Sequence, residues 1–264
     1  MRVLIACLAL LAAPAFAQAA PYDAPGPYTV KQTQGGPGCH VFRPIKPMPS
    51  PSPVILWGNG TNSMVAIYSR MLSQWSSYGF IVAASMSGNV GSGRELIACL
   101  DFLEKENTRD GSPLKGAVDT GHVGASGHSQ GGGGAIMAGR DPRITTTAPI
   151  EPYIIGANFY EPGAERKQHG PMLLLSGGVD TIAVPDRHHK PVFEQANVPV
   201  VWATLLSAGH NSPAVGDSGP FRPITTAWFL YQLAGDQKAA AMFQGASCGY
   251  CNDPLWAIQK RNAD

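Results

Sequence analysis

Residues 122–138 constrain the fold of this chain more than any other segment. They begin with the small residues of 122–127, which suit a tightly packed strand, and continue into a glycine-rich run, 131–138, that must open a helix. A strand that leads at once into a helix is typical of parallel sheets covered by helices. This segment alone therefore favours an α/β architecture.

The same alternation continues along the chain. Short apolar segments predict strands, and apolar residues at helical spacing predict helices between them. The predicted strands are 39–43, 54–57, 80–84, 122–127, 144–148, 171–175 and 198–206, and the predicted helices are 67–75, 95–103, 131–138 and 225–233. We expect a mostly parallel, twisted sheet covered by helices on both faces.

The first 20 residues have the features of a secretory signal peptide. Arg2 precedes an apolar run, 3–11, and small residues follow up to Ala17. Cleavage is expected after Ala17, or after Ala19 or Ala20, whereas a lipoprotein-type cleavage at Cys7 would leave almost no apolar region before it. We expect an exported protein, secreted or periplasmic, whose residues 21–264 form one domain with a cysteine-containing C-terminal tail.

Composition narrows the classes of partner. The net charge is +1 and charged residues make up 14% of the chain, without a basic cluster, so we expect no nucleic-acid partner. No stretch after the leader is apolar enough to span a bilayer. The roughly 240 residues that follow the leader suit a single large α/β domain. We expect it to be a monomer.

Four cysteines follow the leader, at positions 39, 99, 248 and 251. An even number in an exported chain indicates disulfides, and three pairings are possible. The Cys248-Gly249-Tyr250-Cys251 segment can close on itself and hold the tail. A zinc site would require all four thiolates to converge, and a redox motif would require a helix start after a strand.

The pattern Gly-x-Ser-x-Gly occurs at 127–131, with Ser129 at its centre. Chance alone can produce it in a glycine-rich chain, but here a small-residue strand precedes it and a helix follows. This is the context of a nucleophile elbow, a strained turn that tolerates few side chains around the serine. A phosphate-binding loop would end in Gly-Lys-Ser or Gly-Lys-Thr, and this run has no lysine. The elbow predicts an α/β-hydrolase fold.

A serine nucleophile needs a base and an acid, which follow in the order serine, acid, histidine in this fold. Asp180 ends the first strong strand after the elbow, and His210 ends the last one. We predict that Ser129, Asp180 and His210 are catalytic. Glu151 is the reserve choice for the acid, and Asp186 is a further rival.

The other histidines near the motif have different expected roles. His188 and His189 follow Asp180 on an expected helix, where solvent exposure is the simpler interpretation. His128 adjoins the nucleophile, but the elbow should point its side chain away from Ser129. We expect His128 to contribute to substrate binding instead.

The oxyanion formed on attack requires preorganised N–H donors. We predict the backbone of Gln130 as one donor and that of Thr61, in the turn after 54–57, as the other. Asn59 is the alternative donor and a candidate substrate contact. A turn built of glycine and asparagine for local reasons alone is the competing interpretation.

These residues together resemble the bacterial cutinases and poly(ethylene terephthalate) hydrolases, within the chlorophyllase- and dienelactone-hydrolase-like branch of the α/β-hydrolases. The resemblance covers roughly 54–233 and rests on Gly60-Thr61, the elbow, the 149–153 loop, Asp180 and Gly209-His210. It implies the same triad and oxyanion donors, and an open cleft with no lid domain. It also implies that Tyr153 lies where the family carries an aromatic platform for the acyl group. The chain departs from the family's frequent methionine at Gln130 and in the stretch 57–61.

The sequence thus predicts a secreted serine carboxylic-ester hydrolase that needs no metal or organic cofactor. The expected substrate is an exposed or polymeric ester, because the connections between the predicted strands contain no insertion large enough to form a lid. The alternatives are a small-ester or acetyl esterase, a peptidase or amidase on the same fold, and a non-catalytic binding protein that keeps the scaffold.

Overall fold

The computed structural model describes residues 21–263 except 37, 46–50 and 157, so the expected signal peptide, 1–20, lies outside the described residues. Its centre is a nine-stranded sheet in the order β1-β2-β4-β3-β5-β6-β7-β8-β9. Neighbours from β4 to β8 run parallel, and the pairs β1–β2, β2–β4 and β8–β9 are antiparallel. The strands are β1 Val30–Gly35, β2 Cys39–Pro44, β3 Ser52–Gly58, β4 Ile81–Ser85, β5 Val118–His128, β6 Thr146–Ile150, β7 Met172–Gly177, β8 Val200–Leu205 and β9 Trp256–Arg261.

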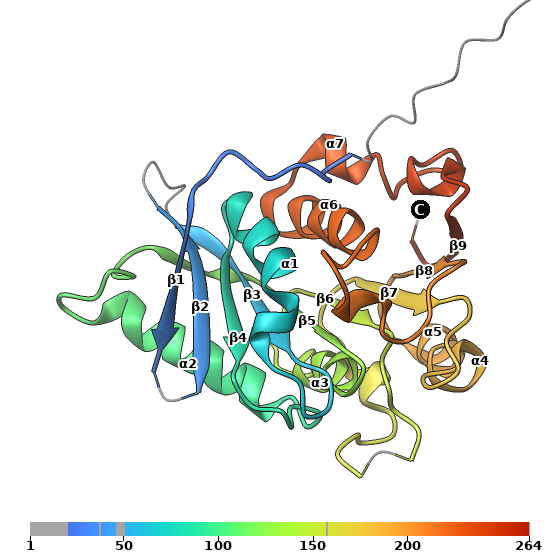
Figure 1. Cartoon of the computed structure of the whole chain (residues 1–264), viewed down its shortest axis with the longest axis horizontal. Coiled ribbons are helices and arrows are strands. Elements are labelled where there is room, and N and C mark those ends of the chain that lie inside the picture. Colours follow the sequence, from blue (N-terminus) through green and yellow to red (C-terminus); the bar gives the residue numbers. More distant parts are fainter. Residues whose placement is uncertain (1–20, 37, 46–50, 157, 264) are drawn as a thin grey trace, which may run out of the picture.

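Helices cover both faces of this sheet, which confirms the predicted fold class (Figure 1). Alternate residues of each central strand point to opposite faces. Ile55 and Trp57 of β3 therefore pack towards the helices 65–77 and 221–234, while Val54 and Leu56 pack towards the helices 94–108 and 130–138. The helices are α1 Val65–Ser77, α2 Arg94–Thr108, α3 Gln130–Ala138, α4 Pro185–His188, α5 Lys190–Gln195, α6 Phe221–Ala234 and α7 Gln237–Ala240. None of the described helices has the length and apolar content that crossing a bilayer requires.

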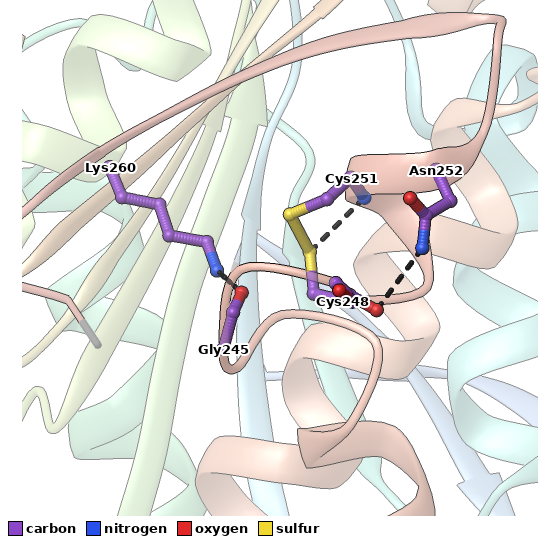
Figure 2. Close-up of a disulfide and its surroundings, with 6 residues drawn as sticks. Gly245, Cys248, Cys251, Asn252 and Lys260 are labelled. Atoms are coloured by element: carbon purple, nitrogen blue, oxygen red, sulfur yellow. Dashed lines mark hydrogen bonds between the residues drawn. A yellow bond between two sulfur atoms is a disulfide. The ribbon is translucent and has the colours of Figure 1, made fainter.

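Two disulfides resolve the pairing that the sequence left open. Cys39 on β2 is bonded to Cys99 on α2, and Cys248 is bonded to Cys251. The second bond closes a turn beside β9, where the Cys251 amide donates to Cys248 Sγ and Lys260 Nζ donates to Gly245 O at 2.6 Å (Figure 2). The C-terminal segment, which the sequence predicts to be a tail, contains the edge strand β9, which pairs with β8.

Loops connect the parallel strands to the following helices at the carboxyl edge of the sheet. Among its described residues, the link from β6 to β7 contains one helical element, the 3₁₀ helix Ala164–Lys167. The turn after β3 is joined to the turn after β4 by the Asn62 amide, which donates to Gly88 O at 2.9 Å. The turns after β3 and β4 therefore lie together at this edge.

Candidate active site

Ser129 occupies a strained turn between β5 and α3. Its backbone has φ 56° and ψ −116°, which a non-glycine residue adopts only when its surroundings impose it. The surroundings are specific: the Ser129 amide donates to Ile150 O at 3.0 Å, and its carbonyl accepts from the Gly133 and Tyr153 amides. Ser129 is half-buried, so its hydroxyl stands at the open edge of the sheet.

The glycines that flank this serine are required by close backbone approach. A Cβ on Gly127 would lie 2.3 Å from Gly131 O, and a Cβ on Gly131 would lie 2.1 Å from Gly58 O. Both distances are far below contact, so a side chain at either position would force the end of β3 away from the turn. This geometry is that of the nucleophile elbow expected from the sequence.

The structure brings Ser129, His210 and Asp180 together, although they lie on three different loops. His210 Nε2 is 2.8 Å from Ser129 Oγ, and His210 Nδ1 is 2.8 Å from Asp180 Oδ2. Because a carboxylate can only accept, the imidazole donates its Nδ1 proton to Asp180, and Nε2 is left to accept the serine proton. His210 and Asp180 are both buried.

Asp180 is held in the ionised form. Burial alone would raise the pKa of its carboxyl, but hydrogen bonds from His210 and from the Ile182 and Ala183 amides outweigh it, and the pKa lies below its usual value. The two amides donate to Oδ1 at 2.7 and 2.9 Å, while His210 occupies Oδ2. The carboxylate is therefore fixed in both position and charge.

Neither rival acid holds the imidazole. Asp186 is exposed on α4. Glu151 is fully buried, and its Oε2 lies 3.8 Å from His210 Nδ1, beyond hydrogen-bond range. Burial, and then the charge of Asp180, raises the pKa of Glu151 to about 10, so this carboxyl is neutral at ordinary pH.

His128 supports the backbone of His210 rather than facing a substrate. It is 3% exposed, and its Nε2 donates to His210 O at 2.7 Å. Its Nδ1 accepts from Tyr68 OH at 2.8 Å, a partner on α1 that the sequence did not reveal. Burial, and then nearby His210, lowers the pKa of His128 to about 3, so the ring is neutral. This burial corrects the expectation that His128 contacts substrate.

The two expected oxyanion donors lie at the same edge of the sheet. Gln130 is the first residue of α3, so its N–H has no acceptor within the helix. Its side chain is occupied, since Oε1 accepts from the Val90 amide at 2.9 Å. Thr61 is exposed in the turn after β3. The roles of both amides remain predictions.

Asn59 has a structural position instead. It is fully buried, its Oδ1 accepts from Trp57 Nε1 at 3.0 Å, and its Nδ2 donates to Ser85 O at 2.7 Å. The side chain ties the ends of β3 and β4 together. It has no free surface for a substrate, which corrects that expectation.

Tyr153 borders Ser129, and its ring packs on His188. The ring centroids are 4.5 Å apart, and the Tyr153 amide donates to Ser129 O at 3.0 Å. His188 Nδ1 accepts from the Ile154 amide. His189 Nδ1 lies 2.6 Å from Ser176 Oγ. Both histidines are buried, so the expectation that they are exposed is wrong.

Comparison with known proteins assigns the chain to a family. A family model described as PET hydrolase-like matches residues 14–243. A bis(hydroxyethyl) terephthalate hydrolase of Streptomyces coelicolor is 25% identical over 203 residues, which cover 71% of this chain and 62% of that protein. Cutinase 2 of Thermobifida cellulosilytica and cutinase cut1 of Thermobifida fusca are each 24% identical over 164 residues, 59% of this chain and 58% and 48% of theirs. The matches thus span less than two thirds of these relatives' lengths. The chain belongs to the PET hydrolase-like family.

Proposed function

We propose that this protein is a carboxylic-ester hydrolase in which Ser129, His210 and Asp180 form the catalytic triad. The observation that carries the proposal is the position of His210, with one ring nitrogen 2.8 Å from Ser129 Oγ and the other 2.8 Å from Asp180 Oδ2. This is the arrangement that converts a serine hydroxyl into a nucleophile. The names of the relatives, cutinases and a terephthalate-ester hydrolase, agree with it.

The reaction follows from these contacts. Ser129 Oγ attacks the ester carbonyl as His210 Nε2 takes its proton, and the Gln130 and Thr61 amides stabilise the resulting oxyanion. The C–O bond to the alcohol then breaks, and His210 returns the proton to the leaving alkoxide. Water, deprotonated by His210, attacks the acyl-enzyme and releases the acid and free Ser129. Asp180 stabilises the imidazolium in both halves of the reaction.

The favoured substrate is an exposed or polymeric ester, as in a cutinase. Large apolar side chains stand exposed beside the catalytic loops, with Val179 60% and Ile182 51% exposed on either side of Asp180, and Leu206 52% exposed after β8. Exposed apolar surface of this kind suits contact with an apolar ligand or surface. The hydrogen bond from the Tyr153 amide to Ser129 O supports the proposal that the Tyr153 ring contacts the acyl group.

The first test is Ser129→Ala with p-nitrophenyl butyrate as substrate. The variant should lose hydrolysis while its circular dichroism stays unchanged, because the hydroxyl is removed without a change in the glycine contacts. Ser73→Ala, at a half-buried serine of α1, is the matched control and should keep full activity. Activity near that of the parent in Ser129→Ala would refute the mechanism.

Substrate class is tested by a second set of measurements. A chain-length series of nitrophenyl esters beside a polyester film separates a polyesterase from a small-ester or acetyl esterase. The matched p-nitroanilide of butyric acid detects an amidase, which uses the same triad. A non-catalytic binding protein would leave every one of these substrates intact.

We also propose that the protein is exported. Two disulfides in the described chain suit an oxidising compartment, and residues 1–20 have the composition of a signal peptide. The mass of the protein recovered from culture medium and from periplasm tests this. A cytoplasmic protein that keeps its first residues would contradict it.

A further inference from the structure

A second carboxyl group lies against the triad and takes no part in the mechanism above. Glu151 directly follows β6, is 0% exposed, and has the strained backbone angle φ 45°. Its amide donates to Leu175 O at 2.8 Å, which fixes the start of its side chain. Neither carboxyl oxygen has a hydrogen-bond partner among the described residues. A buried carboxyl without partners is costly, so its presence needs a reason.

The carboxyl lies beside the nitrogen that Asp180 already holds. Glu151 Oε2 is 3.8 Å from His210 Nδ1, whereas Asp180 Oδ2 is 2.8 Å from the same atom. Glu151 Oε2 is also 3.4 Å from His128 Nε2, whose proton is directed to His210 O. A shift of about 1 Å would bring Glu151 into hydrogen-bond range of the catalytic imidazole.

The surrounding backbone leaves space for this carboxyl. A Cβ on Gly177, at the end of β7, would lie 2.5 Å from Glu151 Oε1 and 2.5 Å from Ala208 O. Any other residue at 177 would therefore collide with the carboxyl or with the loop that carries His210. The glycine keeps the site open for Glu151.

The charge state of the two carboxyls is set by their partners. Asp180 accepts three hydrogen bonds, and Glu151 accepts none among the described residues. Glu151 stays neutral first because it is buried without a hydrogen-bond partner among these residues, and then because the nearby charge of Asp180 disfavours a second negative charge. Asp180 therefore carries the charge and Glu151 the proton. The remaining titratable groups facing Glu151 are His128 on β5, His210, and Tyr68 on α1, whose pKa is raised mainly by burial.

We propose that Glu151 is a positioning residue that serves as a second acid for His210. It stays protonated while Asp180 is ionised. When the Asp180 charge is absent, Glu151 releases its proton to solvent, and the resulting carboxylate accepts the hydrogen bond from His210 Nδ1–H in place of Asp180. The imidazole then keeps the tautomer in which Nε2 accepts from Ser129. This inference rests on the proposed esterase mechanism.

A metal ion is the alternative ligand for the cluster of His128, Glu151 and His210. One ligand atom each from His128, Glu151 and His210 lie within 4.8 Å of one another. Both histidine nitrogens nearest to Glu151 are already engaged, with His210 O and with Asp180 Oδ2. The geometry therefore points to a proton-holding carboxyl rather than to a cation site.

The experiment is a double-mutant cycle with Asp180→Ala and Glu151→Gln, read as kcat/KM for p-nitrophenyl butyrate between pH 5 and 10. Glu151→Gln alone should lower kcat/KM by about threefold or less, because a neutral amide replaces a neutral acid of the same shape. In the Asp180→Ala background the same change should cost about tenfold more, a coupling typical of residues that share a partner.

The pH profile distinguishes this role from a merely structural one. Asp180→Ala should show an additional rise in activity with pH as Glu151 ionises, and this additional rise should be absent after Glu151→Gln is added. Asp180→Asn is the matched contrast, since its amide still fills the site, keeps Glu151 away and fixes the wrong tautomer. It should be less active than Asp180→Ala even though it is the more conservative change.

A second variant, Asp180→Ser, guards against misfolding of Asp180→Ala, because its hydroxyl can still accept from the Ile182 amide. Thermal unfolding of each variant shows whether it is folded. Equal costs of Glu151→Gln in both backgrounds would overturn the proposal. So would a pH profile of Asp180→Ala that does not depend on Glu151. Failure of the esterase mechanism would instead appear as activity in Ser129→Ala, independent of Glu151.

Discussion

Removal of the two disulfides should destabilise the protein to different extents. Cys39–Cys99 joins β2 to α2 across 60 residues, whereas Cys248–Cys251 joins residues only 3 apart. A cross-link stabilises mainly by restricting the unfolded chain, and the restriction grows with the logarithm of the closed loop. The double variant Cys39→Ala/Cys99→Ala should therefore lose more stability than Cys248→Ala/Cys251→Ala.

The loop lengths give the magnitudes. Closing a loop of this longer size is worth about 4 kcal/mol at 25 °C, and closing the shorter one about 2 kcal/mol. Cys39, Cys99 and Cys248 are all buried, so each pair also loses packing when its sulfur atoms are removed, and this part largely cancels in the comparison. About 4 kcal/mol is a large share of a typical domain stability of about 5–15 kcal/mol.

Urea unfolding followed by circular dichroism measures both variants against the parent under oxidising conditions. The longer cross-link should account for about 2 kcal/mol more than the shorter one. Reduced parent protein is the control and should be at least as unstable as either double variant. Equal losses, or a larger loss for the C-terminal pair, would refute the reasoning and place the stabilisation in local packing around Cys251.

Three further predictions concern the active site. Asp180→Asn should lower kcat/KM for p-nitrophenyl butyrate by about 10,000-fold, because the amide fixes the wrong tautomer of His210; a loss below about tenfold would contradict the acid role. Tyr68→Phe leaves the buried His128 Nδ1 without its donor and should cost about 1–3 kcal/mol in urea unfolding, whereas an unchanged stability would show the hydrogen bond to be dispensable. The pKa of Glu151 is raised from 4.5 to about 10. The contribution of this carboxyl to the free energy of unfolding is therefore full below about pH 4.5 and is lost as the pH rises towards about 10. Glu151→Gln should therefore be more stabilising relative to the parent at pH 9 than at pH 5, and a pH-independent difference would oppose this.

The central strands were predictable because burial on both faces makes them continuous apolar segments. Val54–Trp57 lies within β3, and the predicted strand 171–175 overlaps β7, which begins at Met172. The edge strands β1 and β9 were not predicted. Their sequences, VKQTQG and WAIQKR, are polar at half or more of their positions, which suits strands that are paired on one side only and largely exposed. Hydrophobic pattern alone cannot distinguish such segments from loops.

The candidate site divides in the same way. Ser129, Asp180 and His210 were found because each follows a strand that the sequence reveals, and the structure brings the three together. Tyr68 could not be found, because its hydroxyl meets His128 only through the packing of α1 on the sheet. The burial of His188 likewise depends on a contact with the Ile154 amide, which tertiary structure alone creates.

The sheet itself, more than the loops, places the groups that matter. The amide of the residue after β5, Ser129, donates to Ile150 O, the last carbonyl of β6. The amide of the residue after β6, Glu151, donates to Leu175 O of β7, and that of Gly178, after β7, donates to Leu205 O at the end of β8. The hydrogen-bond pattern of the parallel sheet thus continues one residue beyond each strand.

This continuation explains how two strained residues can stand side by side. Ser129 and Glu151 both have positive φ, at a cost of about 1–3 kcal/mol each. The backbone amide of each residue donates a hydrogen bond to the next strand, so relaxing one residue would break a hydrogen bond that also orders its neighbour. The strain is therefore distributed over the edge of the sheet. Strand register thus fixes where the backbones of Ser129 and Glu151 lie relative to each other.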